Sequence, residues 1–96
     1  MKTVWKYSLT PNESIFGTDI WHEMPVGAEI IAVDTQHGSP QMWAVHDVAQ
    51  NYTSKRHFII VGTGHDDIED EWIYVGTFQV NDGSFVFHVY EVPEVI

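Results

Sequence analysis

Apolar and polar positions alternate along most of the chain, which is the pattern of β-strands with one buried face. Seven runs show this alternation or a short apolar core, and each is bounded by residues typical of turns: Thr3–Leu9, Ile15–Met24, Glu29–Gln36, Gln41–Val48, Lys55–Val61, Trp72–Val80 and Ser84–Val92. Runs spaced roughly 8–12 residues apart, with no helical periodicity between them, are typical of all-β domains. The pattern predicts a small antiparallel barrel or sandwich of about six or seven strands.

Three positions in this pattern carry specific turn or bulge chemistry. The segment His37-Gly38-Ser39-Pro40 joins two strand-like runs and predicts a hairpin. Asn81-Asp82-Gly83 predicts a tight turn, because Asn and Asp tolerate the left-handed backbone and Gly favours it. Gly76 interrupts a strand-like run, which indicates a β-bulge or the close approach of another segment.

The last run is apolar on both of its faces, with Phe85, Phe87 and Val89 alternating with Val86, His88 and Tyr90. A strand with one face in water does not show this pattern. The run is therefore either central in a closed structure or in contact with another subunit. The four tryptophans and four tyrosines are expected mostly in the core, which needs large side chains. We predict one domain over residues 1–96 that forms a homo-oligomer.

The charge of the chain limits its partners. Fourteen acidic and four basic side chains give a formal net charge of −10. Nucleic-acid polymers and anionic membranes are both bound through Lys and Arg, so neither is an expected partner. The N-terminal residues lack the apolar segment of a signal peptide, and no run approaches the ~20 apolar residues of a membrane span, so we expect a cytoplasmic location. The absence of cysteine excludes disulfides, thiol nucleophiles and thiolate metal sites.

No residue pattern predicts catalysis, a metal site or a cofactor. The six histidines show no ligand spacing on one local element, and the simpler interpretation of His65-Asp66-Asp67 is a solvated loop. No serine lies in a strand–turn–helix nucleophile motif. We therefore expect the protein not to be an enzyme.

Candidate binding residues are those suited to an anion and to an aromatic base. Gly62-Thr63-Gly64-His65 can present backbone N–H groups and a hydroxyl to an anion, although a tight turn would account for the same residues. Lys55 and Arg56 are the only adjacent basic pair, and Arg56 can grip a phosphate or form an ion pair within the chain. The remaining candidates, taken as stacking faces and their neighbourhood, are Trp5, Trp43, Tyr74 and Thr77.

Stretches along almost the whole chain resemble a family of short phage-encoded proteins known as a domain of unknown function. They are Met1–Tyr7, Glu23–Ile30, Gln36–Pro40 with Trp43-Ala44, Gly62–His65, and Tyr74–Phe78 with Phe85–Val89, whereas Asn12–Trp21 departs from the family. A phage origin implies an anti-defence protein, a virion accessory protein or a regulator of a host enzyme, acting in the host bacterial cytoplasm. Some phage proteins of this size sequester the cyclic nucleotide signals of bacterial immunity. The resemblance therefore implies binding of a cyclic (oligo)nucleotide without cleavage.

Sequestration sets a physical requirement. The ligand must be held with nanomolar affinity, about −12 kcal/mol, by a chain whose net charge repels it. The few cations must then be gathered at pockets between subunits, built from Lys55 or Arg56, the segment Gly62–His65 and an aromatic side chain. In the alternative function, the acidic stretch Asp66–Glu71 mimics DNA and inhibits a host nuclease or regulator, although such a stretch also simply confers solubility.

Overall fold

The computed structural model describes residues 1–10 and 19–93 and places seven strands in them: β1 (Lys2–Ser8), β2 (Asp19–Pro25), β3 (Glu29–Gln36), β4 (Ser39–Asp47), β5 (Thr53–Gly62), β6 (Ile73–Val80) and β7 (Phe85–Val92). Each strand corresponds to one of the predicted runs. Residues 15–18 of the second predicted run lie outside the described residues. None of the described residues belongs to a helix long and apolar enough to cross a membrane.

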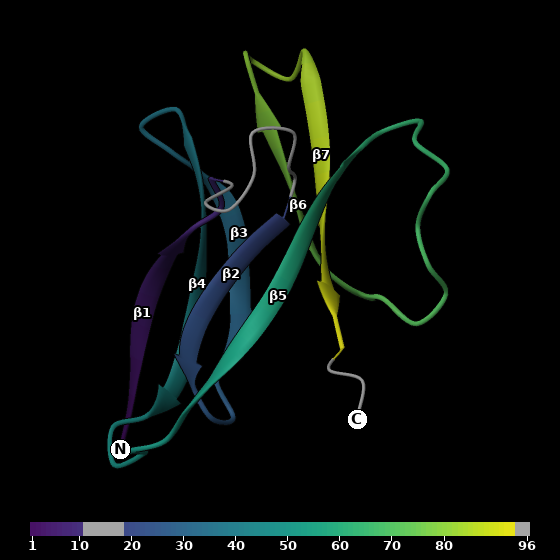
Figure 1. Ribbon diagram of the computed structural model, residues 1–96. Helices are drawn as coiled ribbons and strands as arrows, with labels where there is room; N and C mark the ends of the chain where they lie inside the picture. The colour runs from purple at the N-terminus through teal and green to yellow at the C-terminus, as the bar shows by residue number, and fades with distance from the viewer. Residues whose placement is uncertain (11–18, 94–96) are drawn as a thin grey trace.

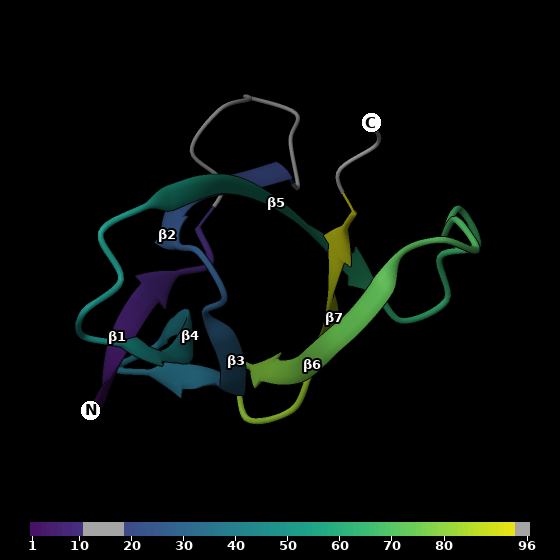
Figure 2. The ribbon, with the colours of Figure 1, turned by 90° about the horizontal axis from the view of Figure 1, so that it is seen from below.

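The strands form two antiparallel sheets, with the orders β1-β4-β3 and β2-β5-β7-β6 (Figure 1). Seen along the strands, the sheets enclose a common interior (Figure 2). The all-β prediction is confirmed, and of the two predicted architectures the sandwich is present rather than the closed barrel. The described strands do not close into a barrel because neither β3 with β6 nor β1 with β2 forms a backbone ladder, although β3 and β6 lie side by side.

The core lies between the two sheets and consists of medium-sized side chains. The fully buried members with the largest side chains are Phe58, Leu9, Ile20, Met24, Met42 and Val89. The expectation that most tryptophans and tyrosines fill this core is wrong, because all eight are half-buried or exposed. The buried aromatic rings are instead those of Phe58 and Phe78.

The predicted turn and bulge chemistry is confirmed. Asn81 and Asp82 have φ values of 52° and 55°, and the Ser84 N–H closes the turn on the Asn81 carbonyl at 3.0 Å. A register shift in the β6–β7 pairing falls between Tyr74 and Gly76. A Cβ at Gly76 would lie only 2.7 Å from Cγ2 of Val33 on β3, so the glycine also permits the close approach of the second sheet.

The two-faced last run is the inner strand β7, flanked by β5 and β6. Its inner face packs Val89 and Phe87 against the core. The opposite face is half-buried and carries His88 and Tyr90, with Tyr90 in contact with the ring of Trp72 at 6.2 Å between centroids. β7 is thus central in its sheet but not part of a closed barrel, and contact of its outer face with another subunit stays a prediction.

Candidate functional site

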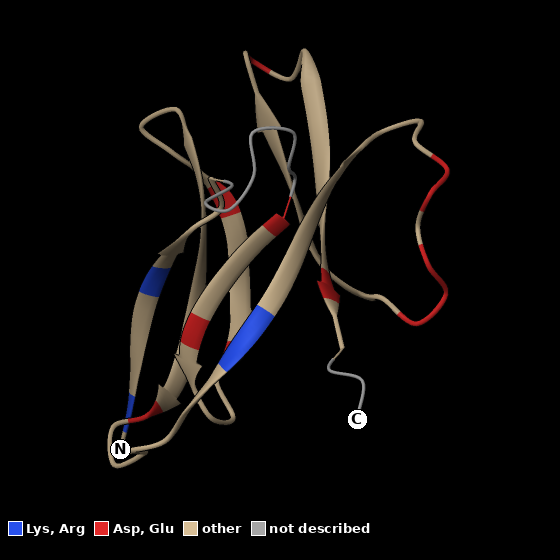
Figure 3. Ribbon diagram, viewed as in Figure 1, with Lys and Arg blue, Asp and Glu red and all other residues tan. Residues whose placement is uncertain are grey.

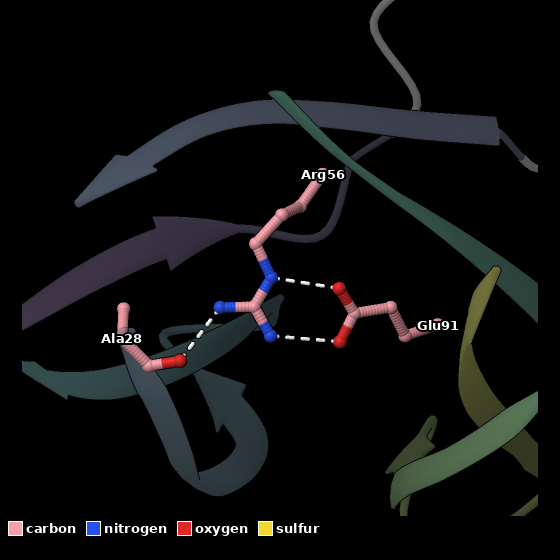
Figure 4. Close-up of polar contacts among 3 residues, drawn as sticks. All are labelled: Ala28, Arg56 and Glu91. Carbon is pink, nitrogen blue, oxygen red and sulfur yellow. Dashed lines mark hydrogen bonds and ion pairs between the residues drawn. The ribbon is translucent and has the colours of Figure 1, made fainter. Parts of the chain in front are cut away.

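Arg56 on β5 is held by three hydrogen bonds near one end of the sandwich. Its Nε and Nη2 each donate to one carboxylate oxygen of Glu91 on β7, both at 2.7 Å, and its Nη1 donates to the carbonyl of Ala28 at 2.6 Å (Figure 4). The two side chains are about one-fifth exposed, at 21% and 18%. Because Ala28 directly precedes β3, the guanidinium ties the four-stranded sheet to the start of a strand in the other sheet.

The hydroxyl of the half-buried Tyr7 lies within the electrostatic range of this guanidinium. Burial raises the pKa of the Tyr7 hydroxyl above its ordinary value, and the positive charge of Arg56 opposes the rise. Among the described residues, the buried Tyr7 Oη has no hydrogen-bond partner. The interior near Arg56 is therefore polar but incompletely paired.

A cleft of about 730 Å³ opens beside Arg56 and is lined by Trp21, Gly27, Ala28, Ser54, Lys55, Arg56, His57, Glu91, Val92 and Pro93. Two of the four basic side chains of the protein thus lie in one cleft. The Lys55 Nζ lies 5.2 Å from the centroid of the Trp21 ring, within the range of a cation–π contact. The Trp21 and His57 rings stack at 4.1 Å with an interplanar angle of 4°, and His57 Nε2 lies 2.7 Å from Asp19 Oδ1.

A chain of hydrogen bonds crosses the outer face of the four-stranded sheet. His88 on β7 lies at its centre, with Nε2 at 2.9 Å from Oγ1 of Thr63 and Nδ1 at 3.0 Å from Oγ1 of Thr77. The hydroxyl of Tyr74 lies 2.5 Å from that of Thr77, and the hydroxyl of Thr63 donates to the Val86 carbonyl at 3.2 Å. The contacts connect β6 and β7 to the residue that follows β5, and we call them the His88 chain.

All the hydrogen bonds of the His88 chain are satisfied by one neutral tautomer of the imidazole, the one with the proton on Nε2. With the proton on Nε2, His88 donates to Thr63 and accepts from Thr77, which in turn accepts from Tyr74. With the proton on Nδ1, the donors along the Thr77 and Tyr74 side reverse, but the single O–H of Thr63 cannot donate to both His88 Nε2 and the Val86 carbonyl. The end at Tyr74 is 56% exposed, so one member of the chain remains open to a ligand or to water.

A family model described as a domain of unknown function (DUF7352) matches residues 1–95. The chain belongs to the DUF7352 family. No curated protein and no solved structure matches it. In this DUF7352 domain, three of the stretches on which the family resemblance rests, Gly62–His65, Tyr74–Phe78 and Phe85–Val89, meet in the His88 chain.

The DUF7352 fold separates the predicted binding residues into distinct groups. Lys55 and Arg56 line the cleft, whereas Thr63, Tyr74 and Thr77 belong to the His88 chain. In an extended strand the seven-residue step from Arg56 to Thr63 spans about 23 Å. Within one copy of the chain, the Gly62–His65 segment and the Lys55–Arg56 cleft are therefore apart, and the pocket expected between subunits stays a prediction.

The other predicted residues lie outside both groups or at their margins. The ring of Trp5 is 52% exposed and makes an edge contact with His46 at 4.4 Å between centroids. Trp43 is half-buried on β4 of the three-stranded sheet. Gly62, Gly64 and His65 adjoin Thr63 in a turn, in which Gly64 has a φ of 97° and the His65 N–H donates to the Gly62 carbonyl at 3.2 Å.

Sequence reasoning missed four residues of this DUF7352 domain that the structure places in the cleft or the chain: Trp21, His57, Glu91 and His88. His88 carried a usable signal, since it is the polar residue on the second face of an otherwise apolar strand. Glu91 carried none, because any of fourteen acids was equally available to Arg56. No group of three or more His, Asp or Glu side chains in residues 1–10 and 19–93 is arranged to hold a metal ion.

Proposed function

We propose that the protein binds a small nucleotide in the Lys55–Arg56 cleft and holds it without cleaving it. The observation that carries the proposal is the gathering of Lys55, Arg56 and the stacked Trp21–His57 pair around one cleft of about 730 Å³. Pockets of this size accommodate small molecules, and aromatic rings beside a basic group match the base and the phosphate of a nucleotide.

The charges in the cleft support this ligand class despite the net charge of −10. The guanidinium has five N–H donors, of which Glu91 and Ala28 occupy three, so two remain for an anion. The charges of Glu91 and Arg56 neutralise each other. The net positive charge of the residues that line the cleft therefore comes from Lys55. Low dielectric in a cleft strengthens the attraction to that charge.

The family resemblance gives this binding a biological setting. A phage protein that sequesters a cyclic (oligo)nucleotide signal would act in the host bacterial cytoplasm and would have no need of catalytic residues. Within one copy, the Gly62–His65 segment lies far along β5 from the cleft. A homo-oligomer that brings this segment of one copy to the cleft of another would complete the expected pocket, and light scattering after gel filtration measures that state directly.

The proposal is tested by calorimetry and thermal shift with a panel of cyclic di- and trinucleotides. A ligand present at 100 times its dissociation constant adds about 2.7 kcal/mol to the stability of the folded state, which a melting curve detects. Lys55→Ala should weaken the binding at least tenfold, and Lys2→Ala, which removes the same charge from β1, should leave it unchanged. Chromatography of the recovered ligand should show it intact.

Three results contradict the proposal: no shift with any member of the panel, equal losses in the two lysine variants, and conversion of the ligand. Equal losses of affinity in Lys55→Ala and Lys2→Ala would show that binding depends only on the net charge of the protein. Conversion of the ligand would make the protein an enzyme.

A second function is favoured by the distribution of acidic residues. The loop between β5 and β6 projects from the sheets and carries Asp66, Asp67, Glu69, Asp70 and Glu71, all exposed (Figure 3). Such a surface can occupy the nucleic-acid site of a host nuclease or regulator. A variant with all five acids changed to amides should then lose the inhibition, which moderate salt should also weaken. Detection of the protein in purified particles would instead assign it to the virion.

A further inference from the structure

The outer face of the three-stranded sheet carries apolar side chains along its centre. On β4, the half-buried Trp43 and Val45 alternate with fully buried residues, so they point away from the core. The register places Val4 of β1 beside Val45, and Ile31 lies in the β-bulge of β3. Val4 and Ile31 are 48% and 54% exposed. The outer face of an antiparallel sheet is usually polar, so this one has the composition of a face that is covered by a partner.

Charged residues of opposite sign flank this apolar centre. β1 carries Lys2 and Lys6, whereas β3 carries Glu29 and Asp34 (Figure 3). All four are paired with outward-facing residues of β4, so they share the outer face of the sheet. The Nζ of Lys6 reaches across β4 and donates to Oε1 of Gln36 at 2.8 Å. One side of the face is therefore basic and the other is acidic.

The three-stranded sheet also bears little of the negative charge of the protein. Its strands contain two of the four basic side chains and three of the fourteen acids, Glu29, Asp34 and Asp47, which is −1 of the total of −10. Five further acids lie in the β5–β6 loop, which projects on the opposite side of the sandwich (Figures 1 and 2). Two copies therefore meet less electrostatic repulsion when they approach through this sheet than through the side that bears the loop.

We propose that the outer face of the three-stranded sheet binds the same face of a second copy, with a two-fold axis parallel to β4. Rotation about this axis places β1 of one copy over β3 of the other, so basic residues meet acidic residues on both sides of the apolar centre. Lys6 then lies between Glu29 and Asp34 of the partner subunit along the strand direction. Trp43 and Val45 of the two copies pack against each other in the centre.

The size of the face sets the strength of this contact. Three strands about 4.8 Å apart and about seven residues long cover roughly 14 by 24 Å, which is at the lower end for specific protein interfaces. The dimer should therefore dissociate on dilution, in the micromolar range. β5, which carries Lys55 and Arg56, belongs to the other sheet, so this inference does not rest on nucleotide binding. A contact between Gly62–His65 and the cleft of another copy is a separate prediction.

Sedimentation velocity from micromolar to millimolar concentration measures the equilibrium, and should show a monomer and a dimer with no larger species. Ile31→Glu places a charge in the apolar centre and should weaken the dimer at least tenfold. Ile73→Glu adds the same charge on β6, at a residue that is 55% exposed, and should change the dissociation constant less than twofold. Melting curves of both variants show that they remain folded.

An exchange of charges tests whether β1 lies over β3 of the other copy. Lys6→Glu should weaken the dimer at least threefold. Adding Asp34→Lys should restore most of that loss, because opposite charges meet again across the two-fold axis. Adding Asp66→Lys instead restores the same net charge on the β5–β6 loop, and should restore little of it.

Four results would overturn the proposal. A monomer at every concentration would show that the face is not an interface, and a trimer or larger assembly would exclude the two-fold arrangement. Equal effects of Ile31→Glu and Ile73→Glu would place the contact on another surface. Equal recovery with Asp34→Lys and Asp66→Lys would show that association depends only on net charge.

Discussion

Arg56 and His88 both lie on strands of the four-stranded sheet, yet they organise their surroundings differently. Arg56 is charged and reaches from β5 to β7 and to the carbonyl of Ala28 at the start of the other sheet. His88 contacts two hydroxyl groups, and one of them, Thr77, is its direct cross-strand neighbour. The first arrangement joins the two sheets, whereas the second lies across the face of one sheet.

The difference shows which of these polar contacts stabilises the packing of the two sheets. A bidentate, charge-assisted pair is about twice as strong as a neutral hydrogen bond, and here it adds a contact that the backbone pairing does not provide. The His88 chain repeats connections that the β6–β7 and β5–β7 ladders already make. Arg56 therefore contributes to stability as well as to the lining of the cleft, whereas the His88 chain adds little to the joining of the two sheets.

Substitution of Arg56 should have the largest effect. Arg56→Met leaves a half-buried carboxylate and the Ala28 carbonyl without their donor, and should lower the free energy of unfolding by about 2–4 kcal/mol. The double variant Arg56→Met with Glu91→Leu removes the orphaned charge and should recover at least half of the loss. Urea denaturation measures both, with Lys55→Met as the neighbouring control. A loss below about 1 kcal/mol for Arg56→Met would remove the structural role that distinguishes it from His88.

The packing of Val33 on Gly76 is a second contact between the two sheets, and it involves no charged group. Gly76→Ala places a methyl group 2.7 Å from Val33 Cγ2, and the strain should cost about 1–3 kcal/mol. Adding Val33→Ala provides the missing space and should restore part of the loss in the same urea experiment. If Gly76→Ala were neutral, the seam would be looser than the contact implies.

Much of the fold was predictable because its signals are local. Alternation along the runs located all seven strands within a few residues, and Asn81 and Gly76 marked a turn and a bulge through their own backbone preferences. The choice between sandwich and barrel depends on whether the edge strands of the two sheets pair, β3 with β6 and β1 with β2, and no local pattern encodes that pairing. The burial of the tryptophans was mispredicted because ring size alone does not show which face of a strand is covered.

The candidate site was predictable only in part for the same reason. Thr63, Tyr74 and Thr77 were predicted from separate segments, and the sheet brings them together through a histidine that was not among the candidates. Lys55 and Arg56 are adjacent in sequence, but successive residues of a strand point to opposite faces. Arg56 consequently turns to Glu91, and Lys55 to the ring of Trp21.

Breaking the His88 chain should cost less than breaking the Arg56 contacts. Thr77→Val keeps the shape of the side chain but removes the partner of His88 Nδ1 and of the Tyr74 hydroxyl, and should lower stability by about 1 kcal/mol. The ¹⁵N shifts of the His88 ring should report a changed tautomer balance. Thr53→Val, which removes a long 3.4 Å contact to Glu23, is the matched control and should cost no more than a few tenths of a kcal/mol. A loss of stability as large as that of Arg56→Met would show that the His88 chain stabilises the fold as much as the Arg56 contacts do.

The smallest effect at neutral pH concerns Tyr7, the unpaired phenol near Arg56. Tyr7→Phe removes a buried hydroxyl without a partner among the described residues, so stability should change by less than about 1 kcal/mol. The pKa of Tyr7 is raised in the folded state, so its neutral form stabilises the fold below pH ~10, and this contribution is lost as the pH rises through the folded-state value. Urea denaturation should therefore show wild type losing more stability than Tyr7→Phe between pH 8 and 11. Tyr52→Phe, at a site 78% exposed, should follow wild type, and equal losses in all three proteins would show that burial does not raise the pKa of the Tyr7 hydroxyl.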